Sequence, residues 1–298
     1  MIIAVLLYAG NILVGKAIND LPPVTIAYIR LLIAFLILLP IGIRAAWRHR
    51  SAFRNHIGPL LVLSLTGIAF FNTFIYASLQ FTSTTNVAVL ETVIPVVTVI
   101  LSALLLKERL RLIQWTGIAI SFGGAVWVVM NGQPSALTGF DWNRGDSLMI
   151  GAILTWAAYS IAVKKYMHLF PPFGALLVMT GLSLAILFPM MLGEWVITGI
   201  PAFDAGSHSV ALLYLGIFPS FIALVCYNRA VDLIGPSKAS VCLNLLPVFT
   251  MIGAWALLNE TITVMQIAGS AVVIVGVMLT TQSTRKKQAG TVPLKKTV

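Results

Sequence analysis

The chain has 298 residues, of which 59% are hydrophobic and only 9% are charged. A soluble domain carries about 25% charged residues, and barrel strands would alternate apolar and polar residues over roughly 10 positions, so this composition excludes both and predicts an all-α integral membrane protein. The formal net charge of +10 would suit a nucleic-acid-binding protein, but the basic residues stand between apolar segments, which argues against nucleic acid as a partner.

Apolar segments of about 20 residues, the length needed to cross a bilayer, recur along the whole chain. The first, which begins MIIAVLLYAG, is interpreted as an uncleaved span because it lacks a basic flank and a small-residue cleavage site. Only 131–146 and 193–208 are long enough to be real loops. We predict ten transmembrane helices, at residues 2–18, 24–43, 57–79, 85–106, 113–130, 147–166, 172–192, 209–231, 238–258 and 263–281.

The second half of the chain repeats the first at shifts of 148 to 152 residues. The segment 21–40 lies over 170–189 with three prolines in register, and Pro95 falls on Pro247. Self-similarity over nearly the whole chain indicates a duplication. The predicted units are a five-helix repeat at 1–132, a second at 147–282 and a basic tail at 283–298.

The distribution of basic residues predicts the orientation in the membrane. With the N-terminus inside, the inner connections and the tail collect 16 of the 19 Lys and Arg residues. The positive-inside rule therefore places both termini in the cytoplasm and the protein in the inner membrane, where the tail is suited to contact anionic lipid. Because each repeat has an odd number of spans, the second copy enters from the opposite side, which predicts inverted repeats of the kind found in secondary transporters.

Three segments resemble those of a known family: YASLQFTSTTNVAVLETVIPV (76–96), KERLRLIQWTGIAISFGGAVWVV (107–129) and NETITVMQIAGSAVVIVGVML (259–279). They are similar to the repeats of the ten-helix drug/metabolite transporter superfamily, EamA type. Members of that family mostly export amino acids and their derivatives, purines or toxic cations, so the resemblance implies efflux of a small metabolite. Glu91 departs from the pattern, because many members have an uncharged residue near this point.

Polar and aromatic side chains fall on single faces of several predicted helices, which indicates a central substrate cavity. Tyr8 and Asn11 recur in the second repeat as Trp156 and Tyr159. Aromatic rings with a few amides suit a zwitterion with an apolar side chain, because the rings stack and the amides hold the charged ends. For each residue the alternative is an interfacial position or interhelical hydrogen bonding worth about 1 kcal/mol or less. The predicted substrate-binding residues are Tyr8, Asn11, Asn72, Tyr76, Glu91, Trp156, Tyr159 and Asn244.

Glu91 is the strongest candidate, because an ionised carboxylate at the centre of a span costs about 3 kcal/mol. Burial favours the uncharged form, so a proton-coupling site is one interpretation, and contact with a substrate ammonium group is another. A structural ion pair with Arg30 or Lys16, or a place on an exposed cavity wall, are the alternatives. Its repeat partner is Leu243, so the predicted symmetry is broken at this carboxylate.

Pro95 and Pro247 each remove a backbone hydrogen bond at the same place in the two repeats. They are hinge candidates for alternating access, and static kinks that aid packing are the alternative. Glu108, beside three basic residues, is expected to form a local salt bridge at the end of its span; Glu260 is its counterpart in the second repeat.

Other classes of membrane protein fit the sequence less well. The chain has no GxSxG or HExxH motif, and its histidines lie in connections or at span ends, which disfavours an intramembrane enzyme. Its two cysteines lie in apolar spans and have no metal-ligand spacing. The prediction is a secondary transporter with no enzymatic activity, no cofactor and no metal, whose partners are a small-molecule substrate, protons and membrane lipid. An intramembrane enzyme, an assembly factor, or a transporter of nucleobases or toxic cations are the alternatives, and no motif indicates an oligomeric state.

Overall fold

The computed structural model describes residues 1–81, 87, 90–108, 110–130, 143–204, 206–258 and 263–281. Within these ranges all regular elements are helices, which confirms the all-α prediction. Five helical segments are long and apolar enough to cross a membrane: Pro23–Arg48, Ile57–Phe81, Arg144–Leu169, Pro172–Thr198 and Ser207–Ile234. Shorter apolar helices accompany them at Ile2–Ala17, Ile94–Leu105, Leu112–Val128 and Val264–Thr280.

The described residues of each half form a series of helical elements. The first half contains α1 (Ile2–Ala17), α2 (Pro23–Arg48), α3 (Arg50–Asn55), α4 (Ile57–Leu63), the π-helical segment η1 (Ser64–Phe70), α5 (Phe71–Phe81), α7 (Ile94–Leu105) and α8 (Leu112–Val129). The second contains α10 (Arg144–Tyr166), the 3-10 turn η2 (Met167–Leu169), α11 (Pro172–Thr198), α12 (Ser207–Ile217), the π-helical segment η3 (Phe218–Ala223), α13 (Leu224–Ile234), α14 (Pro236–Val241), the 3-10 turn η4 (Cys242–Leu245), α15 (Leu246–Leu258) and α16 (Val264–Thr281).

Both predicted long loops are shorter than expected. α10 begins at Arg144 because Asn143 and Asp146 form a capping box, in which each side chain accepts a hydrogen bond from the other residue's backbone N–H. α11 continues to Thr198. The carboxylate of Glu194, near that end, accepts hydrogen bonds from the backbone N–H groups of Val24 and Thr25 at 3.0 and 2.8 Å and so caps the start of α2.

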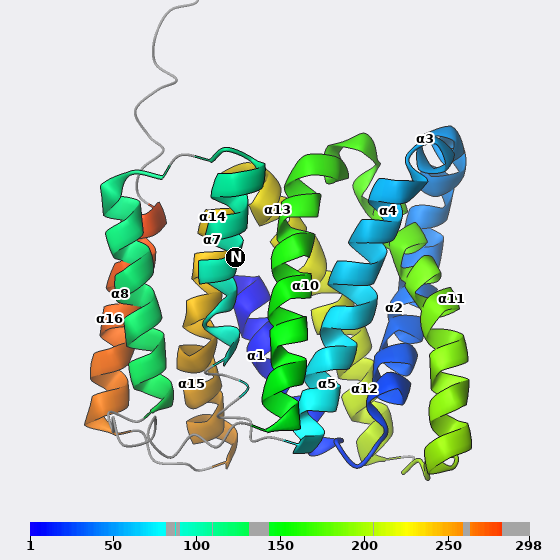
Figure 1. Cartoon of the computed structure of the whole chain (residues 1–298). Coiled ribbons are helices and arrows are strands. Elements are labelled where there is room, and N and C mark those ends of the chain that lie inside the picture. The colour runs from blue at the N-terminus through cyan, green and yellow to red at the C-terminus, as the bar shows by residue number, and fades with distance from the viewer. Residues whose placement is uncertain are drawn as a thin grey trace, which may run out of the picture.

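Two helix pairs form the edges of the bundle. α8 packs against α16 at one edge, and α2 packs against α11 at the other (Figure 1). The α8–α16 contact is close because a Cβ atom at Gly276 would overlap the backbone of Ser121, as expected for small residues between membrane helices. Between the edges, α10 packs against α5 and α7, and α1 packs against η3 and α15. The middle of the bundle is therefore built around α1 and α10.

The basic connections meet at one end of the bundle, the upper end in Figure 1. There Phe53 of α3 stacks on Phe170, just before α11, with ring centroids 5.1 Å apart. Lys164 of α10 donates to the carbonyl oxygen of Asp232 on α13 at 2.7 Å. The connections α2–α3, α10–α11 and α13–α14, which the sequence places on the inner side, thus share one end.

The two prolines begin helices and do not kink them. We expected continuous helices across 85–106 and 238–258, but a turn at Thr92 and Val93 precedes α7, and η4 precedes α15. Pro95 and Pro247 each occupy the second position of the following helix, where the missing N–H costs little. Each span is therefore interrupted immediately before its proline.

No salt bridge to Glu108 is found within the described residues, which do not include Arg109. The carboxylate of Glu108 accepts a hydrogen bond from the hydroxyl of Ser237 at 2.7 Å, which ties the end of α7 to α14. Glu260 lies outside the described residues.

Candidate substrate site

Two small cavities meet at the centre of the bundle and share part of their lining. Each has a volume of about 20 Å³, which is room for about one water molecule. Glu91 and Leu243 line the first cavity, and Arg30 lines the second. The residues common to both are Tyr8, Asn11, Phe71 and Trp156.

An aromatic cluster forms the wall between the halves. Trp156 of α10 is 2% exposed. Its ring centroid lies 5.7 Å from that of Tyr8, in an edge-to-face arrangement, and 4.3 Å from that of Phe71. Tyr159 and Tyr227 extend the cluster at 5.4 and 4.8 Å from Trp156. Tyr8 and Trp156, which the sequence predicts to be equivalent residues, therefore meet in the middle of the molecule on an apolar surface.

Two buried polar atoms in this lining have no hydrogen-bond partner in the described part of the chain: the Tyr8 hydroxyl and Oε2 of Glu91. Each such atom costs about 1–3 kcal/mol, and most buried polar groups in folded proteins are paired. Both residues line the first cavity, which indicates that a ligand or water there completes their hydrogen bonds.

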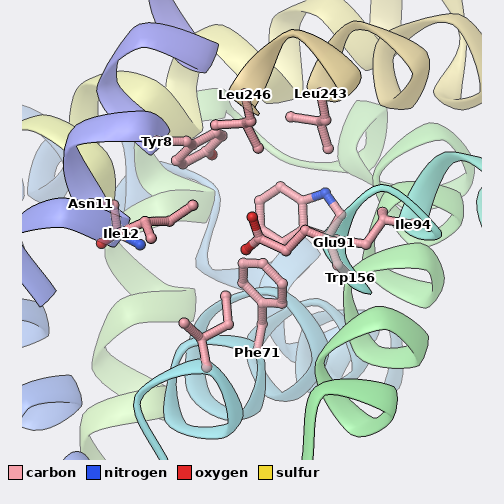
Figure 2. A pocket seen from close by; sticks show the side chains of 10 residues that line it. Tyr8, Asn11, Ile12, Phe71, Glu91, Ile94, Trp156, Leu243 and Leu246 are labelled. Atoms are coloured by element: carbon pink, nitrogen blue, oxygen red, sulfur yellow. The ribbon is translucent and has the colours of Figure 1, made fainter. Parts of the chain in front are cut away.

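Glu91 lies in this space without a counter-ion. It is 7% exposed, and among the described residues neither a hydrogen bond nor an ion pair to its carboxyl group is found. Figure 2 shows the carboxyl group directed toward the middle of the cavity, between the rings of Trp156 and Phe71. The two partners expected for a structural pair are engaged elsewhere, because Lys16 donates to the carbonyl oxygen of Leu79 at 3.3 Å and Arg30 has the partners described next. The structural ion pair is thus not formed.

Arg30 of α2 is 2% exposed and sits in a cluster of neutral acceptors. Its Nε donates to the hydroxyl of Ser220 on η3 at 2.7 Å. Its Nη1 donates to the side-chain oxygens of Asn11 and Asn72, at 2.8 and 3.0 Å, and to the hydroxyl of Tyr76. A guanidinium group is always charged in a protein, so a full positive charge lies beside the second cavity.

A tyrosine–asparagine hydrogen bond flanks the cavities in each half. Tyr76 of α5 donates to Oδ1 of Asn11 on α1 at 2.9 Å. Tyr159 of α10 donates to Oδ1 of Asn228 on α13 at 2.7 Å. Asn228 also lines a third and larger cavity, of about 510 Å³, which lies at the start of α11 with Phe170 among its walls. The second bond therefore joins a residue of the aromatic cluster to a residue that lines this larger cavity.

Most of the predicted site residues come together. Tyr76 and Tyr159 contact the cavity lining through Asn11 and Trp156. Asn244 does not join them, because its Nδ2 donates to the hydroxyl of Ser121 on α8 at 3.1 Å, and its neighbour Leu243 lines the cavity. The residues that line one or both cavities as predicted are Tyr8, Asn11, Asn72, Glu91 and Trp156.

The sequence did not single out four residues that complete the site: Arg30, Phe71, Ser220 and Asn228. Arg30 carries a signal, because an ionisable residue within a span is a functional candidate by default, but the sequence alone suggests it only as a partner for Glu91. Ser220 and Asn228 carry none, because a single small polar residue in a span is common interhelical packing.

Comparisons with known proteins place the fold and the site in a family. The model of the EamA-like transporter family matches residues 1–130 and 143–282. The uncharacterized transporter YyaM of Bacillus subtilis (strain 168) is 27% identical over 77% of this chain and 74% of its own length. An uncharacterized transporter of Archaeoglobus fulgidus is 28% identical over 94% of this chain and 95% of its own.

A solved structure supports the fold. The crystal structure of another protein superposes on this chain with a TM-score of 0.76, covering 94% of both chains at 19% identity. At that identity the likeness concerns the fold alone. The family match spans nearly the whole chain, and with the apolar helices it identifies the molecule: this chain is a multi-pass membrane transporter and belongs to the EamA-like transporter family.

Proposed function

We propose that this transporter is a secondary carrier that exports an amino acid or an amino-acid derivative across the cytoplasmic membrane by alternating access. The observation that carries the proposal is that Tyr8 and Glu91, which line the same aromatic cavity, each have a buried polar atom without a partner in the described residues. A site with apolar walls and a few polar groups is the usual form of a small-molecule site. Its small volume fits a closed state, which opens to admit the substrate.

Alternating access is supported by the matched packing of the two halves. α2 pairs with its counterpart α11, and α8 with its counterpart α16. α10 contacts η1 and α7, while its counterpart α1 contacts η3 and α15, which lie at the matching places in the second half. We therefore propose that residues 1–132 and 147–282 are inverted repeats with the site between them, and that both termini lie in the cytoplasm.

Pro95 and Pro247 are proposed as the hinges of this movement. Each follows an interruption of the α-helical pattern, at Thr92–Val93 and at η4, and the proline itself has no N–H to donate, so fewer α-helical hydrogen bonds oppose bending there. Glu91 and Leu243, which line the cavity, lie within these interruptions or next to them. A small rotation of either helix end therefore changes the shape of the cavity.

Glu91 is proposed to bind a proton and the substrate ammonium group in turn. When protonated, the carboxyl group is neutral and rests in the apolar cavity without a counter-ion. When it loses the proton, the buried negative charge requires compensation, and an ammonium group between the rings of Trp156 and Phe71 supplies it. Exchange of a proton for a cationic substrate group is the coupling step of an antiporter.

The test is counterflow in liposomes loaded with unlabelled metabolite. Uptake of labelled amino acids is measured over a range of about pH 5.5 to 8.5. We expect saturable exchange by the wild type. Glu91→Gln is expected to lose at least about 10-fold in exchange and to lose its dependence on pH. Leu243→Gln places the same amide on the opposite wall and is the matched control, which should keep the pH profile. An unchanged profile in Glu91→Gln would remove the proton-coupling role.

A toxic cation is the second candidate substrate. Aromatic rings around an unpaired carboxyl group are the arrangement that attracts cations. Exchange of labelled amino acids and of labelled quaternary ammonium compounds, measured side by side, separates the two, because a cation carrier would exchange the quaternary ammonium compounds and would show no exchange of amino acids.

A further inference from the structure

We infer that Arg30 is the carboxylate receptor of the central cavity and that it restricts this carrier to substrates with a carboxylate group. The inference rests on the proposed function and names the substrate class that the site accepts. It separates amino acids and related acids from the cations and nucleobases that the aromatic walls alone would also admit.

The first support is a positive charge with no opposite charge beside it. Arg30 is 2% exposed, and its four hydrogen-bond partners, Ser220, Asn11, Asn72 and Tyr76, are all neutral. No carboxylate in the described part of the chain lies within ion-pair distance of it. Because a buried charge without a counter-ion is strongly destabilising, the position is suited to an anion that arrives with the substrate.

The second support is the unused part of the guanidinium group. Nε and Nη1 make all the hydrogen bonds of Arg30, and Nη2 makes none to any described residue. Arg30 lines the second cavity together with Tyr8, Asn11 and Trp156. The fixed fork of N–H donors matches the two oxygens of a carboxylate. The neutral partners thus hold the group in place and leave donors for a ligand.

The third support is the second half of the molecule, where the equivalent position is Met179 of α11, at a shift of 149 residues. Met179 is fully buried. The fold therefore accommodates an apolar side chain at this position, and packing of the repeat does not require an arginine. The charge is present only in the half that also carries Glu91.

Arg30 and Glu91 line neighbouring cavities that share their aromatic walls. A zwitterion between them places its carboxylate on Arg30, its ammonium group on Glu91 and its side chain against Trp156 and Phe71. A simple amine satisfies only Glu91, and a nucleobase satisfies neither charge. The arrangement therefore selects amino acids by charge at two points and leaves the side chain to the aromatic wall.

The experiment compares each transported amino acid with its own carboxamide, which has the same side chain and ammonium group but no carboxylate. Counterflow is measured for both compounds, and thermal stabilisation of the purified protein by each gives an independent readout of binding. The variants are Arg30→Met, which copies the second half, and Arg30→Gln, which removes the charge but keeps donors for the neutral cluster. Met179→Leu is the matched control on α11.

The wild type and Met179→Leu are expected to prefer the acid over the amide by about 10-fold or more. In Arg30→Met and Arg30→Gln this ratio is expected to fall toward one, because the carboxylate of the acid loses the guanidinium group that binds it, whereas the carboxamide has no carboxylate to lose that contact. If Arg30 had only a structural role, its substitution would lower the exchange of both compounds alike and leave the ratio unchanged, and this result would overturn the assignment. Arg30→Gln supplies the answer if Arg30→Met fails to fold. Equal use of acid and amide by the wild type overturns the assignment while leaving the carrier function intact. Absence of saturable exchange with every compound overturns the proposed function and the assignment together.

Discussion

The two halves of the molecule make the same hydrogen bond beside the cavity with the residues exchanged. In the first half Tyr76 on α5 donates to Asn11 on α1, and in the second Tyr159 on α10 donates to Asn228 on α13. Asn11 aligns with Tyr159 at a shift of 148 residues, and Tyr76 with Asn228 at 152. The donor and acceptor have changed places, yet the bond joins the same two positions. The common requirement is a link between these helices, which either arrangement provides.

The surroundings of the two bonds differ. The first is joined by Arg30, whose Nη1 contacts both Asn11 and Tyr76. The second has no such charge, and Asn228 faces the cavity of about 510 Å³. The first half therefore contains the buried positive charge of Arg30. The second half contains the large cavity, which lies at the end of the bundle where the basic connections meet. The following changes test this division, from the largest expected effect to the smallest.

Gly67→Ala, a substitution in the first half, is expected to destabilise the Tyr159–Asn228 hydrogen bond of the second half. A Cβ atom at Gly67, in η1, would overlap the ring of Tyr159, which is fully buried. Overpacking of this kind costs about 1–3 kcal/mol, occasionally more, because the ring must move away from Asn228. Thermal unfolding in detergent measures the loss. Gly58→Ala is the matched control, since nothing lies within 4 Å of the added atom there, and an equal loss in both variants would contradict the packing described.

Tyr159→Phe is expected to cost about 1–2 kcal/mol. Nδ2 of Asn228 already has no partner in the described residues, and removal of the hydroxyl leaves its Oδ1 unpaired as well. The large cavity should then communicate with the aromatic cluster. The free energy of unfolding of the purified variant measures the loss of stability. To test the connection between the cavities, a cysteine is placed at the aromatic cluster, and a thiol reagent that enters through the large cavity should label it faster in Tyr159→Phe.

Tyr76→Phe is expected to cost less, about 0.5–1 kcal/mol. Oδ1 of Asn11 keeps its hydrogen bond from Arg30 at 2.8 Å when the tyrosine hydroxyl is removed. The two tyrosine variants are compared in the same detergent and at the same pH. If Tyr76→Phe proved more destabilising than Tyr159→Phe, the role given to Arg30 in the first bond would be wrong.

Asp204, before α12, gives the smallest effect and lies far from both bonds. Hydrogen bonds from the hydroxyl and backbone N–H of Ser207, and from the backbone N–H of Gly206, lower the pKa of its carboxyl group from 3.8 to about 2. Because the folded-state pKa is lowered, its stabilisation is present above about pH 4 and is lost as the pH falls toward 2. The difference in melting temperature between wild type and Asp204→Ala should therefore shrink over that range. A difference independent of pH would contradict this.

The sequence predicted the helices well because the apolar length needed to cross a bilayer leaves a strong signal in one dimension. It also selected Tyr8 and Trp156 as equivalent residues of a predicted duplication, and their rings lie 5.7 Å apart in the structure. It did not predict the interruptions before Pro95 and Pro247. A proline at the start of a helix and a proline inside one look alike in sequence, and their neighbours decide between them.

The errors at the site have a common cause. α-Helical spacing assigns Asn244 to the cavity, but η4 is a 3-10 turn, which advances about 120° per residue, and Leu243 takes the place at the cavity. Arg30 suggests itself as a partner of Glu91 because both charges lie in spans. A helical pattern gives the face on which a residue lies but not the helix that this face meets, so contacts between distant spans need the structure.

The most direct test of the central claim is whether substrate occupies the space between Glu91 and Leu243. A chain with Leu243→Cys, and with Cys226 and Cys242 replaced by alanine, is labelled with a small thiol reagent during exchange. Ile252→Cys, at an exposed position of α15, is the control. We predict that a saturating transported amino acid slows labelling at Leu243→Cys and leaves Ile252→Cys unaffected. Unaltered labelling at Leu243→Cys while exchange continues would contradict a transport site in the central cavity.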